Sequence, residues 1–195
     1  MQSVSAVTWQ PATHECSLLF PNAEWTLREG GNVRYGQAIL TALNREQTKS
    51  VSVFSFPVPK SMSVQDPRYA KNFKDGFISS GSRPLSDGYT NLSGRIAYWL
   101  TGEKNVAGRQ ASILSYSLHD GSTLYQLHVE SMGTHPVEDD ELLAILGSFQ
   151  IHGKKSTFSG FHFTGDSLAY SLGLAIGFLV VFLVAFRVVV KLRKR

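Results

Sequence analysis

The chain has 195 residues, a length that fits one folded domain with an appendage. Its formal net charge is +4, but five of its 19 basic residues lie among the last nine residues, which leaves 14 basic and 15 acidic residues in 1–166. A domain so close to neutral lacks the basic surface that replaces the counterions of a phosphate backbone, so we expect no nucleic-acid partner.

The N-terminal segment shows no export signal and no reactive site. Residues 1–9 lack the basic start and the apolar stretch of a secretory signal. His14, Glu15 and Cys16 place an imidazole and a carboxylate beside a thiol, which can activate the thiol. Neighbours on an extended segment point to opposite faces, however, so we expect an unreactive thiol. Cys16 is the only cysteine, which excludes an intrachain disulfide and a CxxC site.

The first well-patterned region predicts a hairpin followed by a helix. Gly36–Leu43 and Lys49–Phe56 are alternating runs separated by a polar stretch, as in two antiparallel strands. Asp66 can cap the following helix, and Pro67 fits the first helical position, where its missing N–H costs nothing. We expect this helix to end at Gly81. One aromatic residue at every fourth position gives this helix an apolar face: Tyr69, Phe73 and Phe77.

The region that follows predicts a three-stranded antiparallel meander over residues 91–100, 111–118 and 122–131. Asp120 and Gly121 tolerate the positive φ of a type I′ turn, which would join the last two strands. On the third strand, Gln126, His128 and Glu130 alternate with apolar residues, so we expect these three on a solvated outer face.

A second helix is predicted over residues 137–149, with four acidic residues in its first turn, where the helix dipole favours them. The triplet Asp139, Asp140 and Glu141 lacks the alternating ligand pattern of a calcium loop, so we interpret it as a charged helix start. An antiparallel sheet with helices packed on it is an α+β fold.

Several short motifs, taken in order, resemble the PsbP-like family of α/β/α sandwiches. They are Leu18–Trp25, Asp75–Phe77, Ser93–Tyr98, Asp120–Tyr125 and Ile145–Phe149. The resemblance covers roughly residues 9–151 and implies a PsbP-like globular domain over 1–151. Members of this family mostly bind or help to assemble other macromolecules and share no catalytic constellation. A terminal membrane helix is not part of the usual pattern, and the resemblance implies no functional residue.

The C-terminal part predicts a membrane anchor. Residues 167–186 form an uncharged stretch of 20 residues, and a helix of that length spans a hydrocarbon core of about 30 Å. A buried core helix would rarely stay apolar on all sides and then end in a basic cluster. We therefore expect a linker rich in glycine, serine and phenylalanine over 152–166, a transmembrane helix over 167–190 and a basic tail over 191–195. The basic membrane flank comprises Arg187, Lys191, Arg193, Lys194 and Arg195.

Small residues recur on one face of this helix at Ala169, Gly173 and Gly177, and Gly173–Gly177 is a GxxxG match. The stripe predicts a homodimer through the membrane helix, and a different partner helix is the alternative. The topology clues conflict. The basic tail favours an exported domain, whereas the missing signal favours a domain that faces the cytoplasm, which is the arrangement we expect.

The sequence contains no catalytic or cofactor-binding motif. Its six histidines form no HExxH and no i, i+4 pair, and phosphate loops and a GxSxG elbow are absent. We therefore expect no enzyme activity, metal or cofactor, but a single-pass module that binds or assembles a protein partner at the bilayer. The alternative is a small-ligand carrier or enzyme whose pocket is built from scattered residues: Tyr98, Trp99, Tyr116 and His128.

Overall fold

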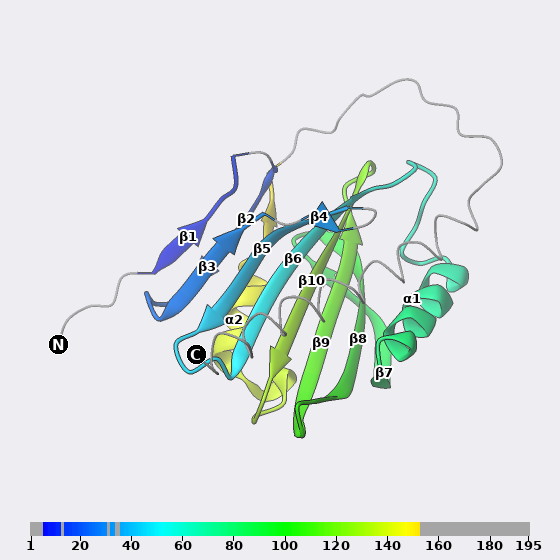
Figure 1. Cartoon of the computed structure of the whole chain (residues 1–195). Coiled ribbons are helices and arrows are strands. Elements are labelled where there is room, and N and C mark those ends of the chain that lie inside the picture. The colour runs from blue at the N-terminus through cyan, green and yellow to red at the C-terminus, as the bar shows by residue number, and fades with distance from the viewer. Residues whose placement is uncertain (1–5, 13, 31, 34–35, 153–195) are drawn as a thin grey trace.

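The computed structural model describes residues 6–12, 14–30, 32–33 and 36–152. Their fold is α+β, with a main antiparallel sheet of eight described strands and two α-helices (Figure 1). The strand order is β3-β5-β6-β10-β9-β8-β7, and β4 pairs with β5 beside this path. The bounds of these strands are β3 Trp25–Glu29, β4 Asn32–Val33, β5 Gly36–Asn44, β6 Lys49–Pro57, β7 Ser82–Leu92, β8 Arg95–Val106, β9 Arg109–His119 and β10 Thr123–Ser131.

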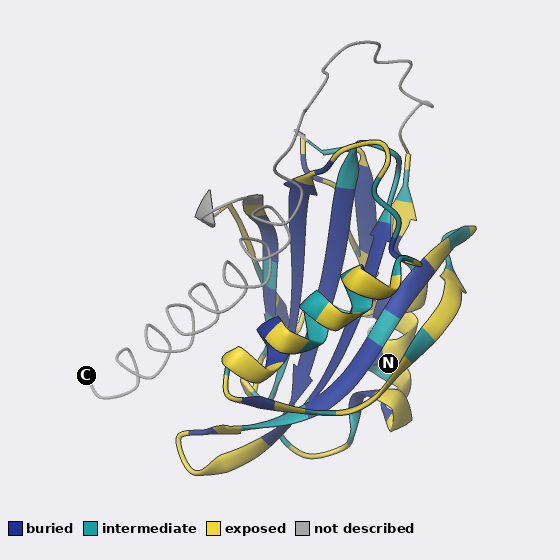
Figure 2. Cartoon of the chain, turned by 90° about the vertical axis from the view of Figure 1, so that its right-hand side faces the viewer, coloured by how far each residue is buried: buried dark blue, intermediate teal, exposed yellow. Residues whose placement is uncertain are grey.

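The remaining elements cover the two faces of the main sheet. They are a second sheet of β1 (Val7–Trp9), β2 (Cys16–Phe20) and β11 (Gln150–Ile151), the helices α1 (Pro67–Ser79) and α2 (Asp140–Gly147), and a 3-10 turn η1 (Pro136–Glu138). One apolar cluster joins α2 and β2 to Leu127 and Val129 of β10. A second cluster joins α1 to Leu124 of β10, whose side chain points to the other face. The helices therefore lie on opposite faces, and the sheet behind α1 is mostly buried (Figure 2).

The predicted hairpin and first helix are confirmed. β5 and β6 pair antiparallel, with a bulge between Ala38 and Leu40. Asp66 caps α1 by accepting a hydrogen bond from the backbone N–H of Arg68, and Pro67 is the first helical residue. The helix ends at Ser79, and Gly81 takes the positive φ of 77° that lets the chain leave it.

The prediction of one strand over residues 91–100 was wrong. The chain reverses within that range, at Ser93 and Gly94, whose φ angles are +55° and +71°. Asn91 and Leu92 therefore end β7, whereas β8 begins at Arg95 and runs antiparallel to it. Two successive positive φ angles are the requirement of a type I′ turn, which suits the twist of a hairpin. The meander thus has a further strand, β7.

The turn before β10 also differs from the prediction. Asp120 and Thr123 face each other, with the N–H of Asp120 donating to the carbonyl of Thr123, so the turn residues are Gly121 and Ser122. Of these two, only Gly121 has a positive φ, as in a type II′ turn rather than a type I′ turn. The side chain of Asp120 accepts hydrogen bonds from the N–H groups of Ser122 and Thr123, which fixes this register.

The second helix is shorter than predicted. Residues 136–138 form η1, and α2 begins only at Asp140, because Asp139 is extended and caps the helix through Leu142 N. The linker 152–166, of which only His152 is described, the membrane helix 167–190 and the tail 191–195 otherwise lie outside the described residues. Within the described ranges, no helix is long and apolar enough to cross a membrane.

Candidate functional site

The outer edge of β7 is an exposed strand edge. β7 ends the main sheet and pairs only with β8 in the part of the chain that the structure describes. Its 11 residues are mostly exposed, and Ser82 is its one buried residue. A strand in this position presents backbone N–H and C=O groups that can pair with another extended segment. β7 is therefore a candidate binding edge.

Polar contacts hold β7 in place from its inner side. Asp87 accepts a hydrogen bond of 2.9 Å from the hydroxyl of Tyr98 on β8 and forms a 2.7 Å ion pair with Lys74 of α1. Burial raises the pKa of Tyr98, and its bond to Asp87 raises it further, so this tyrosine stays a neutral donor. The edge strand is thus fixed both to its neighbour and to the helix, so its outer edge is preorganised for pairing.

Exposed apolar side chains lie beside this edge. Leu85 and Tyr89 on β7 and Ile96 on β8 are large hydrophobic residues that are 46%, 48% and 47% exposed. Tyr89 pairs with Tyr98 across the β7–β8 ladder, and Asn91 pairs with Ile96, so Tyr89 and Ile96 are diagonal neighbours on the α1 side. We call Leu85, Tyr89, Ile96 and the outer edge of β7 the edge surface.

A row of polar side chains crosses the sheet on the α1 side. Ser115 Oγ lies 2.7 Å from Nδ1 of His128, and Nε2 of His128 lies 3.5 Å from a carboxylate oxygen of Glu130. One row away, the amide nitrogen of Gln126 donates a 3.2 Å hydrogen bond to the hydroxyl of Tyr69 on α1. Burial raises the pKa of Tyr69 to about 12, so it too is neutral at physiological pH.

The prediction that this row is a solvated outer face was wrong. Gln126, His128 and Glu130 are 2%, 5% and 4% exposed. In the described part of the chain, Gln126 Oε1 is buried without a hydrogen-bond partner. Alternation located these side chains on the correct common face, but it could not show that this face is buried as well.

The residues named for the alternative, a pocket built from scattered side chains, are divided between two faces of the sheet. Tyr98 and His128 lie on the α1 side, in line with Ser117 and Ser115 of β9. Trp99 and Tyr116 pair with each other on the α2 side. Among the described residues, no group of three or more His, Cys, Asp or Glu side chains could hold a metal ion.

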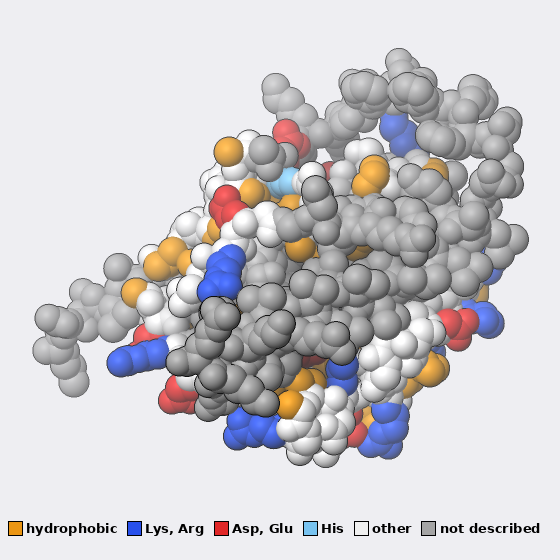
Figure 3. Space-filling model, in the orientation of Figure 1, with side chains coloured by type: hydrophobic (Ala, Val, Ile, Leu, Met, Phe, Trp, Pro, Cys, Tyr) orange, Lys and Arg blue, Asp and Glu red, His pale blue; other side chains and the backbone are white. Residues whose placement is uncertain are grey.

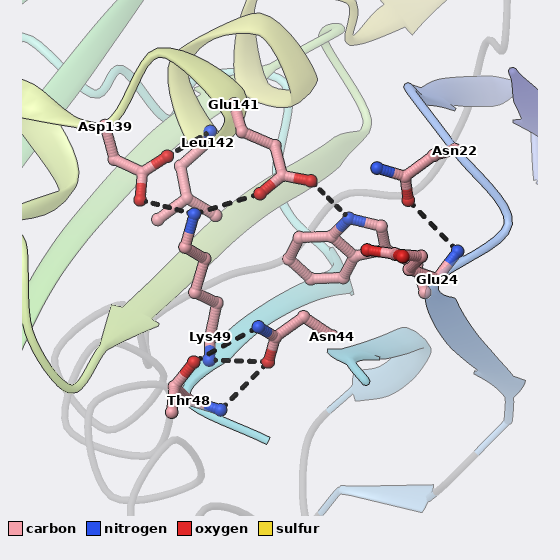
Figure 4. A network of polar contacts seen from close by, with 9 residues as sticks. Asn22, Glu24, Asn44, Thr48, Lys49, Asp139, Glu141 and Leu142 are labelled. Atoms are coloured by element: carbon pink, nitrogen blue, oxygen red, sulfur yellow. Dashed lines mark hydrogen bonds and ion pairs between the residues drawn. The ribbon is translucent and has the colours of Figure 1, made fainter. Parts of the chain in front are cut away.

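Lys49, the first residue of β6, connects α2 to the main sheet. Its Nζ lies 2.7 Å from Asp139 and 2.9 Å from Glu141, and Glu141 also accepts a 3.0 Å hydrogen bond from the indole N–H of Trp25 (Figure 4). Burial acts to raise the pKa of Glu141, but the hydrogen bonds from Lys49 and Trp25 hold it below its ordinary value. Two of the three acidic residues of the predicted charged helix start, Asp139 and Glu141, thus pair with Lys49, whereas Asp140 is exposed.

The N-terminal His-Glu-Cys triplet assembles no reactive centre. Cys16 is fully buried on β2, and burial raises the pKa of its thiol to about 12. His14 instead lies 3.0 Å from Ser55 Oγ through its Nε2. A thiol with so high a pKa carries almost no thiolate at neutral pH, so the expectation of an unreactive cysteine fits this geometry.

Comparisons with known proteins identify relatives by fold only. No family model and no curated protein matches the chain. A protein from Bacteroides thetaiotaomicron VPI-5482 superposes with a TM-score of 0.54 at 11% identity, over 81% of this chain and 52% of its own. LpqN, involved in cell envelope biogenesis of Mycobacterium tuberculosis, superposes with a TM-score of 0.50 at 13% identity, over 77% of this chain and 86% of its own. The chain therefore spans about half of the Bacteroides protein's length.

Proposed function

We propose that this protein is a single-pass, membrane-anchored binding module that takes up an extended segment of a protein partner along the edge surface. The single observation that carries the proposal is β7, an exposed 11-residue strand that ends the main sheet. Strand addition supplies affinity through backbone hydrogen bonds, and side-chain contacts beside the edge supply specificity. Tyr89 and Ile96 provide apolar contacts of that kind.

The anchor is the second part of the proposal. The uncharged stretch 167–186 supports a membrane helix, and the five basic residues after it supply the charged flank expected at the level of the lipid headgroups. Confinement to a membrane raises the local concentration of a partner at the same surface, so that even modest affinity gives occupancy. The α+β sandwich with helices on opposite faces also supports our assignment of a PsbP-like domain.

A small-ligand carrier or enzyme is the second candidate, and the buried polar row favours it. Ser115, His128 and Glu130 form a hydrogen-bonded series of the kind that orients a polar ligand or activates a hydroxyl group. We rank it second because Ser115 is only 1% exposed, so a substrate would need a conformational change to reach it.

Photo-crosslinking in intact cells tests the first proposal. A photoreactive amino acid in place of Tyr89 should yield a discrete crosslinked protein, whereas one in place of Val137, an equally exposed residue on η1, should not. The variants Leu85→Lys and Tyr89→Lys should abolish that complex, since lysine on a strand edge disfavours pairing. Val137→Lys is the matched control. An identical crosslink from both positions, or a complex that survives both β7 variants, would refute binding at this edge.

A further inference from the structure

A hollow lies in the surface of the domain, apart from the edge surface. Its volume is about 430 Å³, and it lies at the β3 side of the main sheet, remote in strand order from β7. The lining comes from β3 and the residues just before it, from the end of β5 and from the turn after β5, and it includes Glu24, Thr26, Arg28, Leu43, Arg45 and Gln47. The hollow is large enough for a small polar group rather than for a folded partner.

The strand register explains why these side chains converge. Thr26 pairs with Leu43, and Arg28 pairs with Thr41, so Thr26 and Arg28 point to the same face as Leu43. Arg45 follows β5 by one residue, in a turn that Asn44 fixes by accepting hydrogen bonds from the N–H groups of Thr48 and Lys49. The register therefore brings Arg28 of β3 and Arg45 of the turn after β5 to one hollow.

The charge of the hollow defines the ligand class. Arg28 and Arg45 form no ion pair within 4.0 Å of another described residue, in contrast to Arg68 and Arg83, which each pair with an acid. Glu24 is the one acidic residue of the lining, so the lining has a net charge of +1. Guanidinium groups present planar pairs of donors that match the oxygens of phosphate, and Thr26 and Gln47 add neutral donors.

We propose that this hollow binds a phosphate group through Arg28 and Arg45. Two sources of phosphate share this chemistry, a free phosphate compound and the headgroup of an anionic lipid. The site is independent of the edge surface, so the failure of either proposal leaves the other standing. Figure 3 shows basic and acidic side chains interspersed over the described part of one molecular face, so a local pair of arginines, not a general positive field, would select the ligand.

Binding to the full chain in neutral detergent tests the proposal, with inorganic phosphate as the first probe. Isothermal titration should show saturable binding that Arg28→Gln and Arg45→Gln each weaken by about tenfold, the usual effect of removing a hydrogen bond to a charged group. Arg109→Gln is the matched control, because Arg109 is exposed in another hairpin. The basic tail adds background binding of phosphate, and this background is the same in all these variants. Glu24→Gln should tighten binding, whereas Glu138→Gln should not.

Short-chain phosphatidic acid, compared with phosphatidylcholine of the same chain length, forms the second arm. Arginine-dependent binding of the lipid without binding of inorganic phosphate would assign the hollow to a headgroup, and binding of both would assign it to phosphate in general. The proposal is overturned if neither probe shows saturable binding, or if Arg109→Gln weakens binding as much as Arg28→Gln and Arg45→Gln. Thermal unfolding of each variant verifies that the exposed substitutions leave the fold intact.

Discussion

Lys49 and Asp139 form a 2.7 Å ion pair that joins β6 to the N-cap of α2. The two residues lie far apart in the sequence, and Asp139 is only 7% exposed, so its charge is compensated almost entirely by Lys49 and by the N–H of Leu142. Glu141 completes the cluster on the other side of the lysine. The cluster therefore ties the start of α2 to the start of β6.

The cluster predicts a pH dependence of stability. The pKa of Glu141 is held below its ordinary value in the folded protein, so the unfolded chain binds the proton more readily. The resulting stability is therefore present above the ordinary carboxyl pKa and is lost as pH falls through the lowered pKa. Chemical unfolding at several pH values below about 5 should show a shallower acid decline in Glu141→Gln than in the wild type. An unchanged slope would contradict the pairing.

Lys49→Met should destabilise the domain more than Glu141→Gln does. The substitution leaves the buried carboxylate of Asp139 without its counter-charge, and breaking a buried pair in this way costs about 3–5 kcal/mol. Urea unfolding of the full chain in detergent measures the change. Lys104→Met on β8, a partly exposed position outside the cluster, serves as a comparison. Equal effects of the two lysine substitutions would mean that the cluster adds little stability.

Gly102 should tolerate no side chain. A Cβ atom there would lie 2.4 Å from the Phe77 ring of α1 and 2.6 Å from the carbonyl oxygen of Arg83 on β7. Since one of these neighbours is backbone, Gly102→Ala should force α1 or β7 to move and lower the free energy of unfolding by about 1–3 kcal/mol. Gly147→Ala is the control, because nothing lies within 4 Å of that added atom. A tolerated Gly102→Ala would refute the close packing of α1 on β8.

Ser115→Ala tests the buried polar row. It removes a 2.7 Å hydrogen bond to His128 in a fully buried setting and should cost about 1–3 kcal/mol of stability. If the row also binds a ligand, that ligand should stabilise the wild type against heat more than the variant. Ser86→Ala, on the exposed strand β7, provides a comparison with a hydroxyl that also has a side-chain partner. Equal costs would mean that the hydrogen bond between Ser115 and His128 adds no more stability than the hydroxyl pair of Ser86 on the exposed strand.

The membrane helix that we propose for residues 167–190 should self-associate through Ala169, Gly173 and Gly177. Gly173→Ile and Gly177→Ile should abolish association in a membrane two-hybrid assay, because close backbone contact across small residues is what favours pairing in lipid. Leu174→Ile and Phe178→Leu, on other faces of the helix, should leave it unchanged. An equal signal from all four variants would show that the glycines are incidental.

The sequence correctly predicted elements whose ends are fixed by capping or turn residues at those ends. The Asp66–Pro67 start of α1 is an example, because the cap and the proline act within one turn. The sequence of β7 contains Pro84, Asp87 and Gly88, which are typical of turns, and only its antiparallel pairing with β8 makes it a strand. Such pairing is tertiary information, so the edge surface could not be predicted from the pattern.

The burial of His128 could not be predicted from the sequence, for a related reason. Alternation assigns a side chain to a face but does not show whether another layer covers that face. Polar residues on one face ordinarily indicate solvent, and here Ser115 and Glu130 satisfy the histidine in place of water. By contrast, the isolation of Cys16 from a catalytic arrangement followed from the geometry of an extended strand alone.

Amide hydrogen exchange of the crosslinked or co-purified complex tests the central claim most directly. Backbone pairing with a partner strand should slow exchange in peptides that cover residues 82–92, relative to the free full chain, because exposed edge amides gain hydrogen-bond acceptors. Peptides that cover β3, which ends the main sheet on the other side, should exchange at an unchanged rate. Protection that appears only outside β7, with residues 82–92 unchanged, would contradict recognition through the edge surface.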